Sequence, residues 1–438
     1  MSSTVGGRSP PELASPPIRP EDTHSLGEHA TPITEATLQP HFTRLAAGDD
    51  TPIALNVHLP FCPSRCLTCD RVAVVQHQPD QQERYIATLQ RELEMVARKL
   101  GHRRSVSRVH FGGGSPNHLS ELALATLFSH IARLFDVSSG TEFSMELNPR
   151  RTSRAQLNFL KGLGIGQIKL EVRDVDANVQ REIGRIQSLE LLEDVISIAH
   201  GVNFESISMD YLLGLPGQTA ESCEQSVEAI CSLNPDSLTC LPFKRRESLF
   251  PHQIAVDSQH LPSLADRLFM FNSLQQGLTS AGYEWVGLNV FSKPDHELAV
   301  AQRQGTLALN VLGYGTDEGL NVLGLGLGAL GELPGLVVQN QTRLAAWHET
   351  VESGSLSAAS AVISGDAEVL QRKVMRGLMC RKDISISSLT ALQKKRWVEP
   401  LVSQGYVEEA ATDFRLTELG RSMLPHVWMD SSPAFRAY

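Results

Sequence analysis

Short apolar runs alternate through the middle of the chain with longer segments whose apolar residues recur every three or four positions. The short runs predict β-strands, and the longer segments predict amphipathic helices. The predicted strands cover residues 52–59, 105–111, 142–147, 167–172, 206–214 and 236–243. A helical pattern follows each of them, and this alternation predicts a parallel sheet because every parallel pairing needs a crossover connection.

Six such units are fewer than the eight of a closed β/α barrel, so the α/β fold is expected to be either an open partial barrel or a doubly wound sheet. Both arrangements place chemistry at the carboxyl ends of the strands. Residues 1–45 are rich in Ser, Pro, Gly and Thr and predict a flexible amino-terminal tail. Residues 46–290 hold the β/α units, and residues 291–438 change rhythm and predict a smaller, mainly helical carboxyl-terminal domain.

The composition of the chain argues against several classes of function. The net charge of −10 disfavours binding to nucleic acid, because such a surface repels phosphate backbones. No apolar run approaches the ~20 residues needed to span a bilayer. The amino terminus lacks the basic-then-apolar order of a secretory signal, so a cytoplasmic location is expected. Seven cysteines, an odd number with three of them clustered, fit a reducing compartment and metal ligation better than a disulfide framework.

The clustered cysteines lie in "FCPSRCLTCDR" (61–71), directly after the first predicted strand. Cys62, Cys66 and Cys69 have C-x3-C-x2-C spacing, and soft thiolate ligands favour an iron–sulfur cluster, zinc or copper(I). Structural zinc normally takes four ligands. His58 is a possible fourth ligand, although its place in the strand pattern favours a packed histidine. Three ligands on a four-iron cluster would leave one iron open to an external molecule.

Other polar and glycine residues also fall where predicted strands end. "FGGGSP" (111–116) ends the second strand and predicts either a tight turn or a main-chain cradle for an amino-acid head group. Glu146 and Asp210 are either solvated carboxylates or acceptors for ribose hydroxyls, and Arg173 follows the fourth strand. Because the carboxyl ends of parallel strands share one edge of a sheet, these residues are expected to form one site with the cysteines.

Three further features receive simpler interpretations. "GLGALG" (326–331) matches a dinucleotide-binding pattern but lies outside the first β/α unit, so close backbone packing is expected. "FKRRES" (243–248) is either a solvated basic face or a contact for substrate carboxylates. The remaining cysteines are expected in the core, namely Cys223, Cys231, Cys240 and Cys380.

Taken together, these motifs resemble those of radical S-adenosylmethionine (SAM) enzymes, and more closely those of the oxygen-independent coproporphyrinogen III oxidases. The resemblance runs from about residue 45 nearly to the end of the chain. The segments that carry it are "NVHLPFCPSRCLTC" (56–69), "VHFGGGSPNHL" (109–119), "FSMELNPR" (143–150), "DANVQREIGRIQ" (176–187), "MDYLLGLPGQT" (209–219), "PDHELAVAQRQG" (294–305) and "LTELGRSML" (416–424).

The resemblance implies a partial (β/α)6 barrel with a 4Fe-4S cluster on Cys62, Cys66 and Cys69 and with SAM on the cluster's open iron. It implies SAM binding by Asn56, Gly112, Gly113, Gly114, Ser115, Glu146, Arg173, Arg185 and Asp210. The implied reaction is anaerobic oxidative decarboxylation of coproporphyrinogen III propionates to vinyl groups, which forms protoporphyrinogen IX in haem biosynthesis. An electron donor is the implied partner, and the cofactor supplies the difficult chemistry.

The chain departs from the family pattern at three positions. Arg71 stands where many of these oxidases carry a fourth cysteine, Asn56 replaces a typical tyrosine, and Arg173 replaces a common glutamine. Three other interpretations therefore remain open: a haem-binding or haem-trafficking protein that keeps the cluster, a radical SAM enzyme acting on another tetrapyrrole, and a zinc-only structural protein.

Overall fold

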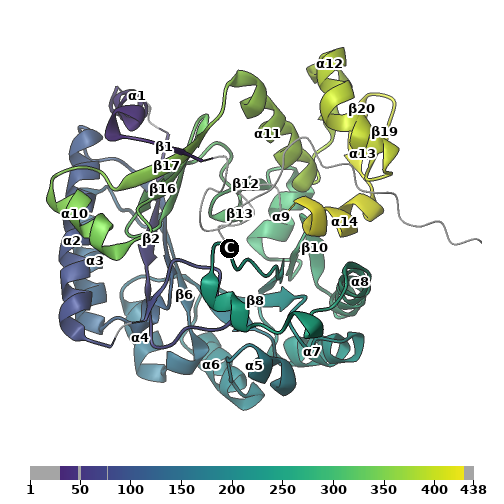
Figure 1. Ribbon diagram of the computed structural model, residues 1–438, viewed down its shortest axis with the longest axis horizontal. Helices are drawn as coiled ribbons and strands as arrows, with labels where there is room; N and C mark the ends of the chain where they lie inside the picture. Colours follow the sequence, from purple (N-terminus) through teal and green to yellow (C-terminus); the bar gives the residue numbers. More distant parts are fainter. Residues whose placement is uncertain (1–29, 48–50, 76, 429–438) are drawn as a thin grey trace, which may run out of the picture.

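The computed structural model describes residues 30–47, 51–75 and 77–428, and its centre is one large curved sheet. The six predicted strands all form, and each is parallel to the next in chain order. They are β2 (Ile53–Leu59), β5 (Val106–Gly113), β6 (Glu142–Leu147), β7 (Gln167–Arg173), β8 (Ser206–Leu213) and β9 (Ser237–Pro242). The sequential order identifies an open partial barrel rather than a doubly wound sheet, and Figure 1 shows the sheet curving inside a ring of helices.

The helices that connect these strands cover the outer face of the sheet (Figure 1). They include α2 (Pro79–Lys99), α3 (Glu121–Leu134), α4 (Arg154–Gly162), α6 (Leu189–Gly201), α7 (Ala220–Leu233) and α8 (Leu264–Ser280). In α2, Tyr85, Leu89, Leu93 and Val96 recur at helical spacing and are buried against the sheet. Several of the other helices begin at a side-chain cap, as at Ser120, whose hydroxyl accepts from the Ala123 amide.

Alternate residues of each strand point away from the helices and form the inner face of the sheet. Most of these residues are polar. Strand register aligns these residues in rows across the barrel. The lowest row holds Asn56, His110, Ser144, Gln167 and Ser206, the next holds Glu146, Lys169, Ser208 and Ser237, and the third holds Glu171, Asp210 and Thr239. Residues of the two lower rows line a cavity of about 120 Å³ inside the barrel.

Residues after 283, together with β1 (Thr31–Pro32) from the start of the described chain, extend the sheet at both edges. On one side β11 (Val290–Ser292) pairs antiparallel with β9, and β10 (Glu284–Val286) follows it. On the other side β14 (Asn321–Leu325) pairs parallel with β2. Antiparallel strands then continue outward through β15 (Leu330–Leu333), β16 (Leu336–Asn340), β17 (Ala358–Ile363) and β1 (Thr31–Pro32). The strand that leads into the cysteine loop is therefore an interior strand of the sheet.

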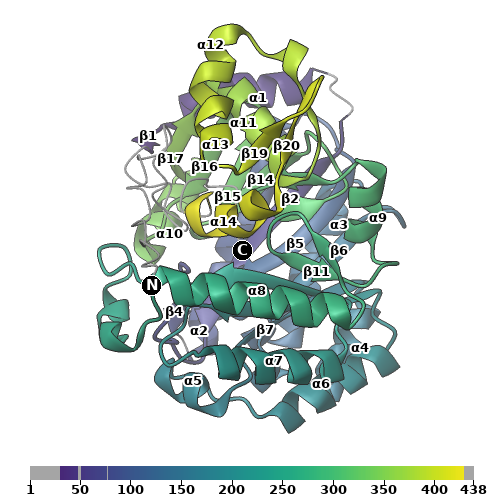
Figure 2. The same cartoon turned by 90° about the vertical axis from the view of Figure 1, so that its right-hand side faces the viewer.

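The last part of the chain is mainly helical and lies at the top of Figure 2. It contains α11 (Asp366–Met379), α13 (Glu399–Ser403), α14 (Glu418–Trp428) and a hairpin of β19 (Val407–Glu409) and β20 (Asp413–Leu416). The division into domains at residues 45 and 290 stays a prediction. Of the helices formed by the described residues, none has the length and apolar character needed to cross a bilayer.

The flexible tail expected for residues 1–45 is wrong for residues 31–45. These residues form β1 and helix α1 (Glu35–Ala46), and Leu38, Phe42 and Leu45 of that helix are buried in the main core. Their helical spacing was masked in the sequence by Pro40 and by the polar residues around it. Residues 1–29 lie outside the described part of the chain.

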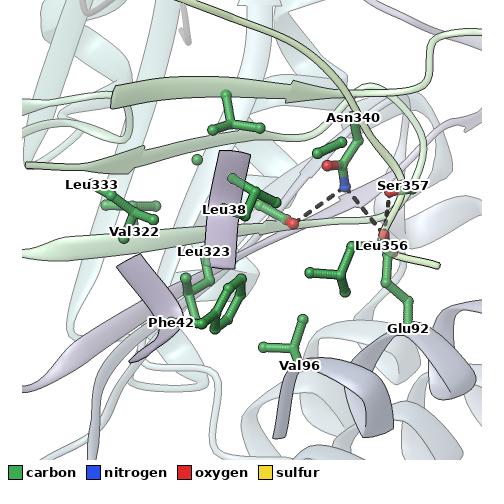
Figure 3. Close-up of a pocket in the computed structure, with 14 residues that line it drawn as sticks. Leu38, Phe42, Glu92, Val96, Val322, Leu323, Leu333, Asn340, Leu356 and Ser357 are labelled. Atoms are coloured by element: carbon green, nitrogen blue, oxygen red, sulfur yellow. Dashed lines mark hydrogen bonds between the residues drawn. The ribbon is translucent and has the colours of Figure 1, made fainter. Parts of the chain in front are cut away.

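The glycine-rich segment at 326–331 packs closely against neighbouring backbone, as predicted. A Cβ on Gly326 would lie 2.6 Å from the carbonyl oxygen of His58, and one on Gly331 would lie 3.0 Å from the carbonyl oxygen of Val322. The Gly326 amide donates to the carboxylate of Glu92 on α2 at 2.7 Å. Figure 3 shows Asn340 and Ser357 directed at the same carboxylate, and both donate hydrogen bonds to it. Burial raises the pKa of Glu92 to about 6.

Candidate cofactor site

The three clustered cysteines lie on one loop between β2 and α2, at the carboxyl end of the first parallel strand. Cys62 ends the short strand β3 (Phe61–Cys62), and the Cys69 amide donates to the Cys66 carbonyl at 3.2 Å in a tight turn. All three thiols are free and partly exposed. Burial raises the pKa of Cys62 to about 12 and that of Cys69 to about 11, so a metal that binds them displaces protons.

The glycine turn after β5 supports this loop through its main chain. The Gly114 amide donates to the Leu59 carbonyl at 2.9 Å, and the Ser115 amide donates to the Phe61 carbonyl at 2.8 Å. A Cβ on Gly114 would lie 2.5 Å from the Pro60 oxygen, so only glycine fits there. Ser115 Oγ lies 3.7 Å from Cys62 Sγ. The turn therefore fixes the position of the cysteine loop.

His58 has the packed role that its strand position predicted. Its Nε2 hydrogen-bonds to the Val72 carbonyl at 2.8 Å, and burial lowers its pKa to about 4. Gly113, with φ of +115°, lies against the ring, and a Cβ there would be 2.7 Å from the imidazole. Hydrogen bonding and packing account for this histidine.

A second loop, which follows β9, holds the cysteine loop from the other side. His252 Nε2 and Gln253 Nε2 both donate to the Cys69 carbonyl, at 2.7 and 3.0 Å. Gln253 is fully buried, and its side-chain oxygen accepts from the Arg246 amide at 2.6 Å. Arg245, in the predicted basic run, donates to the main-chain carbonyl of Gln253 at 3.0 Å. Arg245 of the basic run therefore stabilises the conformation of the loop after β9.

Arg71 lies at the centre of the site, only 6% exposed. Its Nη1 donates to the carboxylate of Glu146 and to the Gly113 carbonyl, the latter at 3.3 Å. The same nitrogen is 3.4 Å from a carboxylate oxygen of Glu171, and Nη2 is 3.9 Å from one of Asp210. One guanidinium therefore faces three buried carboxylates.

The Arg71–Glu146 pair is charged at neutral pH. Burial raises the pKa of Glu146, but the guanidinium of Arg71, with smaller effects of His110 and Lys169, outweighs it and leaves this pKa well below its usual range. Burial acts against the charge of Arg71 as well, and the neighbouring carboxylates of Glu146 and Glu171 reverse that effect and raise its pKa. A buried pair of this kind is held by mutual attraction and is costly to break.

Two more arginines predicted for the site join this cluster. Arg185 Nη1 donates to Cys66 Sγ at 3.4 Å, and its Nη2 donates to the Glu171 carbonyl at 2.6 Å. Arg173 has φ of +74° at a β-bulge, and its Nη2 lies 2.8 Å from the Glu171 carboxylate. The bulge turns Arg173 toward the charged cluster instead of continuing the strand pattern.

Asn56 is the one predicted site residue that the structure does not bring into the charged cluster. It lies in the lowest row of the inner face, and its side-chain nitrogen donates to the Leu330 carbonyl at 2.9 Å. The others gather at the carboxyl ends of the strands. They are Gly112, Gly113, Gly114, Ser115, Glu146, Arg173, Arg185 and Asp210, beside Cys62, Cys66 and Cys69.

Glu171 and Lys169 belong to the same cluster, although neither was predicted for the site. Lys169 Nζ lies 2.9 Å from Asp210, and Glu171 meets three of the arginines. A signal was present: in "QIKLEVR" (167–173) polar residues alternate with apolar ones along a strand that is flanked by helices. Such alternation within a barrel strand indicates a polar inner face.

The residues present suit an iron–sulfur cluster and a polar ligand beside it. Three thiols on one loop are the donors that iron–sulfur clusters take. Asp210 is fully buried, yet neither of its carboxylate oxygens accepts a hydrogen bond of good geometry, and Arg185 Nε donates none. Hydrogen-bonding capacity therefore remains for the amino, carboxylate and hydroxyl groups of a molecule such as SAM. Among the described residues, no three or more His, Cys, Asp or Glu side chains surround a single-ion site.

Comparison with known proteins identifies the relatives of this chain. Residues 56–230 match the model of the radical SAM superfamily. An oxygen-independent coproporphyrinogen III oxidase of Pseudomonas aeruginosa is 29% identical over 404 residues, which cover 89% of this chain and 88% of that protein. The Escherichia coli protein of the same name is 28% identical, with 96% and 92% covered.

A solved structure agrees with these sequence matches. Coproporphyrinogen III oxidase from Escherichia coli, described as a radical SAM enzyme, superimposes with a TM-score of 0.82 at 27% identity. The superposition covers 90% of this chain and 92% of that one. The shared fold therefore includes the strands and helices beyond the barrel.

Proposed function

We propose that the chain is a radical SAM oxidoreductase that decarboxylates coproporphyrinogen III, because residues 56–230 match the radical SAM superfamily and about nine tenths of the chain is related to oxygen-independent coproporphyrinogen III oxidases. Two propionate side chains become vinyl groups, and the product is protoporphyrinogen IX. The observation that carries the proposal is the three-cysteine loop held against the glycine turn at the mouth of a barrel that the oxidase structure shares.

Cys62, Cys66 and Cys69 would bind the 4Fe-4S cluster, and Arg185 would stabilise the thiolate of Cys66 by the hydrogen bond that it already donates. When bound, the cluster and SAM supply the one-electron chemistry that removes a hydrogen atom from a substrate propionate. Glu146 and Asp210 would accept hydrogen bonds from SAM. The Gly113 amide, beside them, donates to the Glu146 carboxylate at 3.3 Å.

The protein's part in this reaction is to bind, orient and exclude water. Glu146, Glu171 and Asp210 are all buried, so their interactions are strong because water does not screen them. The loop carrying His252 and Gln253 contacts the cysteine loop and limits access of solvent and oxygen from that side. The polar cavity on the inner face offers room beneath Glu146 for polar groups or water.

An anaerobic assay tests the proposal. The protein is reconstituted with iron and sulfide and supplied with SAM, a strong reductant and coproporphyrinogen III. The expected products are 5′-deoxyadenosine, methionine, carbon dioxide and protoporphyrinogen IX. Formation of 5′-deoxyadenosine without protoporphyrinogen would reject this substrate and leave the radical SAM assignment standing.

A second candidate is a haem-binding or haem-trafficking protein that keeps the cluster. The observation in its favour is Arg71, a buried cation in the site where many of the oxidases carry a cysteine. Titration with haem separates the two candidates, because the enzyme is expected to turn over porphyrinogen and the haem carrier to bind haem without turnover. A radical SAM enzyme for another tetrapyrrole would form 5′-deoxyadenosine only with that substrate.

The proposed reaction also defines partners and location. A tetrapyrrole is the substrate, and an external electron donor has to reduce the cluster. The free cysteines and an oxygen-sensitive cluster suit a reducing compartment, so the cytoplasm is the proposed location.

A further inference from the structure

The Arg71 side chain lies where a ligand of the site would have to bind. It follows the last cluster cysteine by two positions, and its guanidinium reaches back into the barrel to Glu146 and the Gly113 carbonyl. Both of these partners come from strands that end at the glycine turn and beside it. The side chain therefore ties the cysteine loop to the residues proposed for SAM.

The Arg71 guanidinium does not form all the hydrogen bonds that the buried polar groups around it could make. Its Nε and Nη2 donate no hydrogen bond. Asp210 Oδ2 lies 3.9 Å from Nη2 and Oδ1 lies 2.9 Å from Lys169 Nζ, yet neither oxygen accepts a hydrogen bond of good geometry. Buried donors and acceptors that face each other without a bond are costly, and a ligand that supplies better partners gains free energy from them. SAM carries an ammonium group and two ribose hydroxyls, which are donors of the kind that these carboxylates require.

We infer that Arg71 competes with SAM for the buried carboxylates, so that it stabilises the SAM-free protein and weakens the affinity for SAM. This inference rests on the proposed function. In the SAM-free protein the guanidinium neutralises Glu146 and lies within 4 Å of Glu171 and Asp210. When SAM's donors bind the same oxygens, Arg71 gives up at least its hydrogen bond to Glu146.

A neutral side chain at position 71 is expected to lower the stability of the SAM-free protein and to raise its affinity for SAM. In Arg71→Met the carboxylate of Glu146 loses its nearest cation, whereas Glu171 keeps Arg173 and Asp210 keeps Lys169 and Arg173. Repulsion among the buried carboxylates then lowers the stability of the SAM-free protein. A ligand with a sulfonium and an ammonium group restores positive charge to the site and no longer has to displace a guanidinium.

The test compares SAM binding by the reconstituted wild type, Arg71→Met and Arg104→Met. Arg104 is also buried, but it donates to the main-chain carbonyls of Leu45 and Thr51, away from the site. Dissociation constants are measured by anaerobic equilibrium dialysis without reductant, so that SAM is not cleaved. Unfolding temperatures are measured on the same samples without SAM.

The expected result is that Arg71→Met binds SAM at least about tenfold more tightly than wild type, the change that one charge-assisted hydrogen bond corresponds to. Its SAM-free form should unfold at a lower temperature. Arg104→Met should keep the wild-type affinity. Weaker SAM binding by Arg71→Met would overturn the inference and identify Arg71 as a ligand of SAM's carboxylate. Unchanged affinity would overturn it as well.

Two further measurements keep the result decisive. If Arg71→Met does not fold, Arg71→Gln, which keeps two donors without the charge, is expected to show the same tighter binding. Iron content is measured on every sample. Full iron with no SAM binding by wild type and by both variants would reject the proposed function. SAM binding by wild type with no gain in the variants would reject only the role of Arg71.

Discussion

The side-chain amide of Gln253 donates to the main-chain carbonyl of Cys69 at 3.0 Å, across 184 positions of sequence. His252 donates to the same oxygen, and the Arg246 amide donates back to Gln253. A fully buried side chain therefore links the loop after β9 to the last cysteine of the cysteine loop.

Gln253→Ala is expected to weaken cluster retention. It removes one donor from the Cys69 carbonyl and leaves the part-buried Arg246 amide without its acceptor, at a cost of about 1 kcal/mol. The measurement is the rate at which the reconstituted protein loses its iron to a chelator. Gln259→Ala, an exposed position of the same loop, is the control. Equal rates for Gln253→Ala and wild type would show that the contact does not hold the cysteine loop.

Cys66→Ala is expected to abolish cluster binding and SAM cleavage without unfolding the protein, because the thiol is partly exposed and outside the main core. Iron content, 5′-deoxyadenosine formation and the thermal unfolding profile are the measurements. Cys231→Ala, on the outer helix α7, is the matched control and should keep wild-type iron. Four irons per chain in Cys66→Ala would contradict the ligand assignment.

Gly114→Ala is expected to displace the cysteine loop, because its methyl group would lie 2.5 Å from the Pro60 oxygen. Overpacking of this kind costs about 1–3 kcal/mol, which urea unfolding can measure. Gly201→Ala on α6 has no atom within 4 Å of the added carbon and serves as the control. A wild-type unfolding midpoint for Gly114→Ala, with full iron loading, would sink this account of the turn.

Glu92 is expected to make stability depend on pH. Burial raises its pKa from 4.5 to about 6, so the folded chain holds this proton more tightly than the unfolded chain. The resulting stability is complete below pH 4.5 and is lost as the pH rises through about 6, a change of about 2 kcal/mol. The measurement is the difference in unfolding free energy between wild type and Glu92→Gln across this range. Glu83→Gln, exposed on the same helix, is the control, and a difference that stays constant with pH would refute the assignment.

Sequence reasoning could identify the barrel and most of the site because both depend on local patterns. The six parallel strands were visible as apolar runs between helical patterns, and Cys62, Cys66 and Cys69 were visible as a spacing. Strand order then brought Glu146 and Asp210 to the same edge, as parallel topology requires.

The remaining features depend on partners far away in the chain. The ion pair between Arg71 and Glu146 joins positions 75 apart, and nothing in the local sequence of either predicts the other. Helix α1 is stabilised because Leu38 and Phe42 are buried in the core, and its proline-containing sequence does not predict this burial. Strand β14 is rich in glycine and leucine and gains its conformation from pairing with β2.

The pairing of β14 with β2 also sets an order of events during synthesis. Until residues 321–325 have left the ribosome, one edge of the strand that leads into the cysteine loop has no neighbour to cover its backbone groups. A nascent chain that has completed all six β/α units therefore still presents an unpaired strand edge beside the cysteines proposed as metal ligands. Nearly three quarters of the chain must therefore be made before this edge is covered, and until then the edge is open to mispairing.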